Sequence, residues 1–355
     1  MPVIEVAFTS GAKSTCLIER GALTRLPESC AAAGLPGPAG LLCDARLFSL
    51  HREALLALRP AFGDPLARPV SEARKSLAEV EAMCEVLSAR GIQRDGFVVA
   101  VGGGVLTDLA GLAAALYLRG VPWVSVPTTL LAQVDAGLGG KTGANLRAGK
   151  NLVGAFHQPR LVVCDPDLLA TLPPRERWSG LAEVVKCALL AGGALLERCE
   201  QDLEKAAAGD AAALLPLIEG AVRLKAGLVA GDEREGGARA FLNLGHTVGH
   251  ALEAATQYAH FTHGEAVALG LRGALEISPL PERERALALV RRLQVAADRA
   301  LDAGQREAAL QAMTRDKKVR GGKVRFVLLD AIGSPRLTEV SPAQCTAALA
   351  AALSG

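Results

Sequence analysis

Apolar residues change their spacing along the chain near residue 173. Before that point, short apolar runs alternate with segments of helical spacing; the runs lie at residues 40–44, 95–104, 121–126 and 161–165. Alternating strands and helices predict an α/β domain with a parallel, Rossmann-like sheet. A hairpin is expected before it, from residues 3–8 and 14–19.

Beyond residue 173 the apolar residues recur with helical periods instead. These segments lie at residues 180–190, 195–208, 211–231, 247–255, 265–275 and 282–301, and a late hairpin is expected at 323–329 with 336–339. The pattern therefore predicts two domains, an α/β domain over 1–173 and a mostly α-helical domain over 174–355.

Composition excludes several classes of protein. Half of the residues are apolar and the formal charge is +2, without a basic tract between aromatic residues, so a nucleic-acid partner is not expected. The eight cysteines form no CxxC pair, which is typical of reduced thiols in the cytoplasm. No signal peptide and no apolar run of membrane-spanning length is visible, so we expect a soluble cytoplasmic protein without a membrane partner.

A glycine-rich turn follows the apolar run at residues 95–101. Gly102, Gly103 and Gly104 lead into a segment with helical spacing. A strand, a glycine turn and a helix N-terminus make an anion site, because glycine lets backbone N–H groups approach a phosphate. A tight structural turn is the alternative. Lys141 and Lys150, each flanked by glycines, favour a phosphate site.

Asp44 ends the buried run at residues 40–44. An acid at the carboxyl end of a parallel strand can accept hydrogen bonds from a nucleotide ribose. A helix cap for the segment that follows is an equally good explanation.

Four of the six histidines fall between residues 246 and 263. His246 and His250 are four residues apart, so a helix over 247–255 would project both imidazoles from one face, where they could bind a metal. Helix packing or capping is the alternative. His263 begins the next apolar run and would face the first helix across a short loop.

Glu183 lies in an apolar segment with Lys186 three residues further on. A carboxylate in such surroundings is costly unless it is paired or bound to a cation. A surface pair with Lys186 is one explanation. A third metal ligand is the other, because two histidines and a glutamate form a typical catalytic zinc site.

Several blocks of the sequence resemble the 3-dehydroquinate synthase family of sugar phosphate cyclases. These blocks are GGGVLTDLAG, RGVPWVSVPTTLLAQVDAGLGGKTGAN, GKNLVGAFHQP, SGLAEVVK and RAFLNLGHTVGHALE, and the resemblance runs from about residue 44 to about residue 318. It implies catalytic NAD, a divalent metal (zinc or cobalt), a homodimer, and an active site between the two domains. The implied activity is a carbon–oxygen lyase of the shikimate pathway and aromatic amino acid biosynthesis. The substrate would be a phosphorylated sugar acid, 3-deoxy-D-arabino-heptulosonate 7-phosphate.

The resemblance also implies roles for single residues. It assigns the metal to Glu183, His246 and His263, and moves His250 to the substrate phosphate. Lys225 and Arg239 match the carboxylate-binding residues, Glu235 with His250 the proton relay, and Arg119 a residue that reaches the partner subunit's site. The remaining catalytic matches are Asp135, Lys141, Asn151, Lys186, Asn243 and one of Lys317 and Lys318, of which Lys317 is chosen.

The residues that match the family's NAD site are Asp44, Glu72, Lys75, Gly103, Gly104, Val105, Asp108, Thr128, Thr129, Lys141, Lys150 and Thr171. One departure lies beside them, because Val70-Ser71 stands where the family usually has Asp-Gly. The rival functions are another sugar phosphate cyclase of secondary metabolism and a metal-dependent polyol dehydrogenase.

Overall fold

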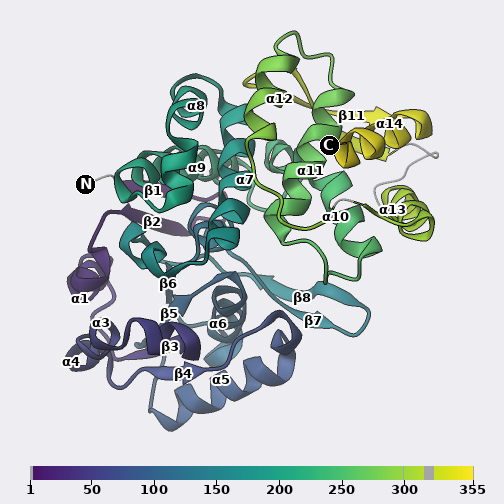
Figure 1. Cartoon of the computed structure of the whole chain (residues 1–355). Coiled ribbons are helices and arrows are strands. Elements are labelled where there is room, and N and C mark those ends of the chain that lie inside the picture. The colour runs from purple at the N-terminus through teal and green to yellow at the C-terminus, as the bar shows by residue number, and fades with distance from the viewer. Residues whose placement is uncertain (1–2, 299, 316–323, 355) are drawn as a thin grey trace. The chain divides into compact units, whose positions relative to one another are not determined.

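The computed structural model describes residues 3–298, 300–315 and 324–354, and the chain forms two compact units (Figure 1). The first unit comprises Met1–Leu172 together with Lys225–Arg234, and the second comprises Pro173–Leu224 with Glu235–Gly355. Helix α9 (Ala211–Gly231) therefore contributes residues to both units, whereas the sequence predicts one boundary, at residue 173.

A mainly parallel sheet forms the centre of the first unit, as the spacing of apolar residues predicts. Its order over the described residues is β1-β2-β9-β6-β5-β3-β4, and only β1 runs antiparallel to its neighbour. The strands are β1 (Val3–Ala7), β2 (Lys13–Ile18), β3 (Ala39–Asp44), β4 (Leu66–Arg68), β5 (Phe97–Gly102), β6 (Trp123–Pro127) and β9 (Leu161–Cys164).

Both faces of this sheet are covered. Along β5, Phe97, Val99 and Val101 pack into one core, whereas Val98 and Ala100 pack into a second core. Strands that are buried on both faces have sequences of consecutive apolar residues, as β5 does. The α-helices of this unit are α1 (Leu26–Ala32), α2 (Ala45–Leu50), α3 (Arg52–Leu56), α4 (Arg59–Phe62), α5 (Leu77–Ala89) and α6 (Gly104–Leu116). It also contains the short 3-10 helices η1 (Ala22–Arg25), η2 (Glu72–Arg74), η3 (Tyr117–Arg119) and η5 (Pro166–Thr171) and the π-helix η4 (Ala132–Ala136).

A separate hairpin of strands β7 (Lys141–Leu146) and β8 (Gly149–Phe156) also belongs to the first unit. It packs on helix α6, where a Cβ on Gly111 would lie 2.5 Å from Thr142 Cγ2. The parallel register places the carboxyl ends of β5 and β6 side by side, with Gly102 opposite Pro127. Loops that carry candidate site residues therefore leave the same edge of the sheet.

The second unit is mostly helical, so the structure confirms the expected fold class. Its elements are α7 (Pro174–Ala191), α8 (Gly193–Ala208), the first part of α9, η6 (Ala238–Asn243), α10 (His246–Ala255), α11 (His263–Glu276), α12 (Arg283–Arg291), α13 (Ala303–Arg315), β10 (Val324–Ala331), β11 (Ser334–Val340) and α14 (Pro342–Leu353). Among the described residues, no helix combines the length and apolar character that crossing a bilayer requires.

One helix is shorter than its apolar spacing predicts. The expected helix over 282–301 is wrong beyond Arg291, where α12 ends. The backbone N–H of Ala296 instead donates to Glu265 Oε1 at 2.9 Å. Glu265 also forms a capping box with Thr262 at the start of α11 and a pair with Arg175 at 2.7 Å. The side chain of Glu265, on a different helix, thus accepts the hydrogen bond that the backbone N–H of Ala296 would donate within a longer α12.

Helices α7 and α11 approach each other closely at Gly264, where an added Cβ would lie 1.9 Å from the carbonyl oxygen of Ser179. We expect Gly264→Ala to lower the free energy of unfolding by about 2 kcal/mol or more, because backbone must move to admit the methyl group. Gly227→Ala is the matched control, since it is also helical but exposed, with nothing within 4 Å. That change should be neutral or stabilise by up to about 1 kcal/mol. Chemical denaturation of the metal-free variants measures both, and equal midpoints would contradict the close packing.

Candidate active site

The structure contains the strand, glycine turn and helix N-terminus, between β5 and α6, from which the sequence predicts an anion cradle. Helix α6 starts at Gly104, and its N-cap residue Gly103 supplies no side-chain hydrogen bond. A Cβ on Gly103 would lie 3.1 Å from Thr129 Cγ2, and one on Gly104 would lie 3.1 Å from Ala136 Cβ. Glycine thus lets the backbone pass close to these two side chains at the N-terminus of α6, a helix of 13 residues. The cradle fits the diphosphate of a dinucleotide such as NAD.

A lysine and an aspartate that match the NAD site form an ion pair beside this cradle. Lys75 Nζ lies 2.5 Å from Asp108 Oδ2, and Lys75 is buried. Burial raises the pKa of Asp108 to about 6, although the ammonium of Lys75 opposes this shift. Lys75 Nζ also donates to Asn151 Oδ1 at 2.6 Å, so the structure connects a nucleotide-side match with a phosphate-side match.

Other NAD-site matches have structural roles of their own. Asp44 Oδ1 accepts the backbone N–H of Arg46 at 2.7 Å and so caps α2, which is the second explanation offered by the sequence. Thr171 Oγ1 lies 2.8 Å from His51 Nε2. Thr128 donates its backbone N–H to Gly102 O, next to the cradle. Contacts of these residues with NAD stay predictions.

Asp135 and Lys225 are brought together within the first unit, although 90 residues separate them. Lys225 Nζ lies 2.5 Å from Asp135 Oδ1, and Lys225 is 5 % exposed. Arg119, at the end of η3, has a φ of 69°, in the left-handed region that rarely suits an arginine. Lys141 begins β7 and is exposed.

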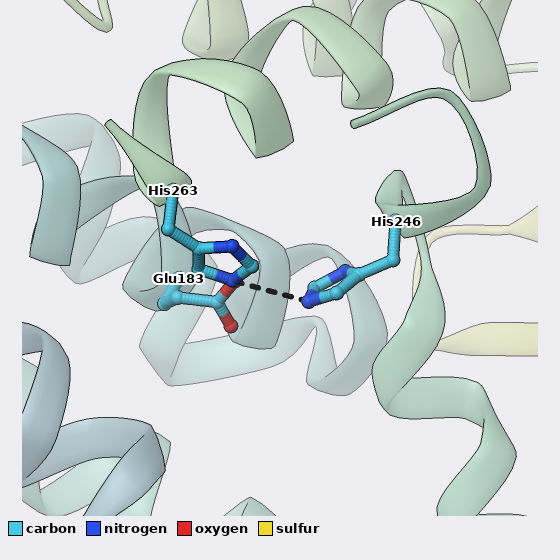
Figure 2. Close-up of side chains that lie close together, drawn as sticks. All are labelled: Glu183, His246 and His263. Carbon is cyan, nitrogen blue, oxygen red and sulfur yellow. Dashed lines mark ion pairs between the residues drawn. The ribbon is translucent and has the colours of Figure 1, made fainter. Parts of the chain in front are cut away.

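Glu183, His246 and His263 converge from helices α7, α10 and α11 (Figure 2). Their candidate ligand atoms all lie within 4.8 Å of one another. Glu183 Oε1 is 3.5 Å from His246 Nε2 and 3.6 Å from His263 Nε2, and it has no hydrogen-bond partner among the described residues. This buried carboxylate oxygen accepts no hydrogen bond from the described part of the chain and faces two imidazole nitrogens. The arrangement fits a divalent metal, because two histidines and one carboxylate are a common catalytic ligand set.

Charge around this cluster keeps Glu183 ionised. Burial by itself would raise the pKa of Glu183, but the Lys186 ammonium and the imidazoles of His246 and His263 outweigh it and hold this pKa well below its usual value. Burial and then Lys186 lower the pKa of His246 well below its usual value. Glu183 and Lys186 do form an ion pair, but both residues are 1 % exposed, so the alternative of a surface pair is wrong.

Glu253 is a residue of this cluster that the sequence did not single out. Its Oε1 lies 3.4 Å from His263 Nδ1, on the opposite side of the ring from Glu183. Burial lowers the pKa of His263, but Glu183 and Glu253 outweigh it and raise that pKa to about 10. His250, Glu253 and His263 form a second group with ligand spacing. In the sequence, the only indication that Glu253 belongs to this cluster was its position three residues after His250, on the same helix.

Residues matched to the proton relay and to the substrate lie on or near η6. Asn243 Nδ2 donates to Glu235 Oε1 at 2.7 Å, and Glu235 adopts a φ of 60°. Arg239 is 2 % exposed, whereas His250 is exposed and its ring centroid lies 5.2 Å from that of His246. Lys317 and Lys318 lie outside the described residues.

Two histidines on the same helix allow a matched test of the metal ligands. We expect His246→Ala and His263→Ala each to lower the affinity for a divalent metal by more than about a hundredfold, because even residues that only support a ligand contribute about 10- to 100-fold. His250→Ala should retain the metal. Metal content after dialysis against a weak chelator measures this. Loss of metal from His250→Ala with retention in His246→Ala would refute the assignment.

Comparisons with known proteins agree with this geometry. The domain family described as 3-dehydroquinate synthase N-terminal matches residues 66–179, and the one described as 3-dehydroquinate synthase C-terminal matches residues 180–319. A curated 3-dehydroquinate synthase of Rhodospirillum rubrum is 45% identical over 328 residues, which cover 88% of this chain and 85% of the relative.

Two similar solved structures are sugar phosphate cyclases. A 2-deoxy-scyllo-inosose synthase with carbaglucose-6-phosphate, NAD+ and Co2+ has a TM-score of 0.87 at 27% identity, over 98% of this chain and 99% of that chain. A 2-epi-5-epi-valiolone synthase from Streptomyces hygroscopicus subsp. jinggangensis with NAD+ and Zn2+ has a TM-score of 0.84 at 28% identity, over 99% and 98%. With both family domains matched and this identity to a curated relative, the chain belongs to the 3-dehydroquinate synthase family.

Proposed function

We propose that the chain is a 3-dehydroquinate synthase in activity as well as in family. The reaction converts 3-deoxy-D-arabino-heptulosonate 7-phosphate to 3-dehydroquinate and phosphate, with catalytic NAD and a divalent metal. The observation that carries the proposal is that one chain holds both a glycine cradle at the start of α6 and a buried Glu183–His246–His263 cluster. NAD+ and a divalent metal are both present in the two similar cyclase structures.

When bound, NAD supplies a reversible oxidation of a substrate alcohol, and the metal supplies Lewis acidity toward substrate oxygens. The chain's own residues have to bind and orient the substrate. Lys225, held by Asp135, presents a buried ammonium, and Arg239 presents a buried guanidinium. These cations suit the substrate carboxylate, because hydrogen bonds between a cation and a carboxylate are stronger than those between neutral groups.

Asn243 holds one oxygen of the Glu235 carboxylate, and this contact fixes the orientation of the group. Glu235 is therefore suited to accept a proton, together with His250, in the relay that the resemblance implies. Lys141, Asn151 and His250 are proposed to bind the substrate phosphate. Such a site has to hold one polyanion in a single pose rather than supply many acid–base groups.

The rival functions are less well supported. A cyclase of secondary metabolism shares the fold, but the two similar cyclase structures are 27–28% identical to this chain, against 45% for the curated 3-dehydroquinate synthase. A probable glycerol dehydrogenase from Sinorhizobium meliloti, at 18% identity, shares only the fold. We further propose a homodimer in which Arg119 reaches the partner's site, zinc or cobalt as the metal, and a cytoplasmic location.

Arg239 allows a test of carboxylate recognition. Arg239→Ala should weaken binding of a carboxylate-bearing substrate analogue by roughly ten- to hundredfold, because a lost charged hydrogen bond costs about 1.5–3 kcal/mol. A decarboxylated analogue should be affected far less. Arg223→Ala is the control, since that arginine is an exposed partner of Glu219 on α9. Competition binding measures both ligands, and equal weakening of the two would count against the role.

The reaction itself is tested by following phosphate and NADH together. With the heptulosonate phosphate, metal and a small amount of NAD, we expect phosphate to appear over many turnovers without net NADH, because the cofactor is regenerated in each cycle. A colorimetric phosphate assay beside absorbance at the NADH band measures this. Stoichiometric NADH release without phosphate would identify a dehydrogenase instead.

A further inference from the structure

Asn145 lies where the two strands of the β7–β8 hairpin change register. The pairing shifts between Ala144 and Leu146, so that Asn145 on β7 faces the three residues 150–152 of β8. Extra residues opposite one partner form a bulge, and bulges often re-aim side chains beside functional sites. This bulge contains Lys150 and Asn151, both of which match binding residues of the family.

The side chain of Asn145 connects this bulge with a second segment. Its Oδ1 accepts the backbone N–H of Asn151 at 2.9 Å. Its Nδ2 donates to Glu72 Oε1 at 2.8 Å and is 3.4 Å from the Glu72 carbonyl oxygen. The backbone N–H of Asn145 donates to Lys75 O at 2.7 Å, outside its own hairpin. One residue therefore contacts the 72–75 turn and the bulge at once.

The residue that Asn145 supports has an uncommon backbone conformation. Asn151 has a φ of 55°, in the left-handed region, which asparagine tolerates better than most residues. Its side chain is held from the other side by Lys75 Nζ at 2.6 Å. Lys150 precedes Asn151 in the bulge, and its Nζ lies 3.7 Å from Glu72 Oε1. The 72–75 turn and the bulge thus form one connected polar network within the first unit.

We propose that Asn145 is a positioning residue that sets the NAD-binding turn and the phosphate-binding bulge relative to each other. The inference rests on the proposed function, in which Glu72, Lys75 and Lys150 bind NAD and Asn151 binds the substrate phosphate. An amide suits this position because it donates and accepts hydrogen bonds at once. The network also gives the 72–75 turn a support that does not involve Val70-Ser71, the departure from the family pattern.

The main test is the affinity of Asn145→Ala for two separate ligands. Its NADH dissociation constant, from fluorescence titration, should rise by about 5- to 10-fold, as expected for the loss of one hydrogen bond. The inhibition constant of inorganic phosphate should rise by a similar factor through Asn151. Leu146→Ala, an exposed neighbour in the same hairpin, should change both constants by less than about twofold.

Two further variants separate positioning from a general loss of structure. Asn145→Asp has the same shape and keeps the acceptor for Asn151 but places a carboxylate beside Glu72, so NADH binding should weaken at least as much as in Asn145→Ala. In a Glu72→Ala background, Asn145→Ala should change NADH affinity by less than about twofold, because its partner is already missing.

The outcomes distinguish this inference from the proposed function. Wild-type affinities in Asn145→Ala, or the same loss of NADH affinity with and without Glu72, would overturn the positioning role while the wild-type enzyme still turns over. A wild-type protein that does not bind NADH would overturn both.

Discussion

A carboxylate that is 1 % exposed has to be compensated by the groups packed around it, and the second unit is built around that requirement at Glu183. An isolated buried charge is costly, and removing one partner of a buried pair leaves the other uncompensated. Lys186 supplies a charge from the same helix, while His246 and His263 supply imidazoles from two others. The cluster therefore depends on α7, α10 and α11 packing closely, and a divalent cation would complete the compensation.

Glycines make this close packing possible. A Cβ on Gly270 of α11 would lie 1.9 Å from the carbonyl oxygen of Gly245, which precedes α10, and one on Gly249 would lie 3.0 Å from Ala266 O. Gly264 has the same role between α11 and α7. Glycine destabilises a helix interior, so these positions lose helical propensity in exchange for close backbone approach. Two of these glycines are direct neighbours of candidate metal ligands in the chain, because Gly245 precedes His246 and Gly264 follows His263.

The fold by itself does not decide the chemistry. Dehydrogenases and reductases at 16–18% identity share the fold with TM-scores of 0.64–0.69, whereas the two cyclases reach 0.84–0.87. One fold commonly hosts several reactions, and side chains at the site distinguish them. For this chain we propose that the distinguishing groups are the buried cations Lys225 and Arg239, because they suit a carboxylate that glycerol-like substrates lack.

The sequence by itself determined the fold class, the glycine turn before α6 and the family, because apolar periodicity and glycine turns are local signals, and the matching blocks are long. Local patterns did not decide which groups meet, and only the tertiary structure brings them together. Helical spacing paired His246 with His250, whereas the family resemblance named Glu183, His246 and His263, and the structure places these three side chains side by side. The end of α12 at Arg291 and the network at Asn145 were also invisible in the sequence. In each case the deciding partner, Glu183, Glu265 or Glu72, is tens of residues away, and only packing brings it within reach of a hydrogen bond or a metal.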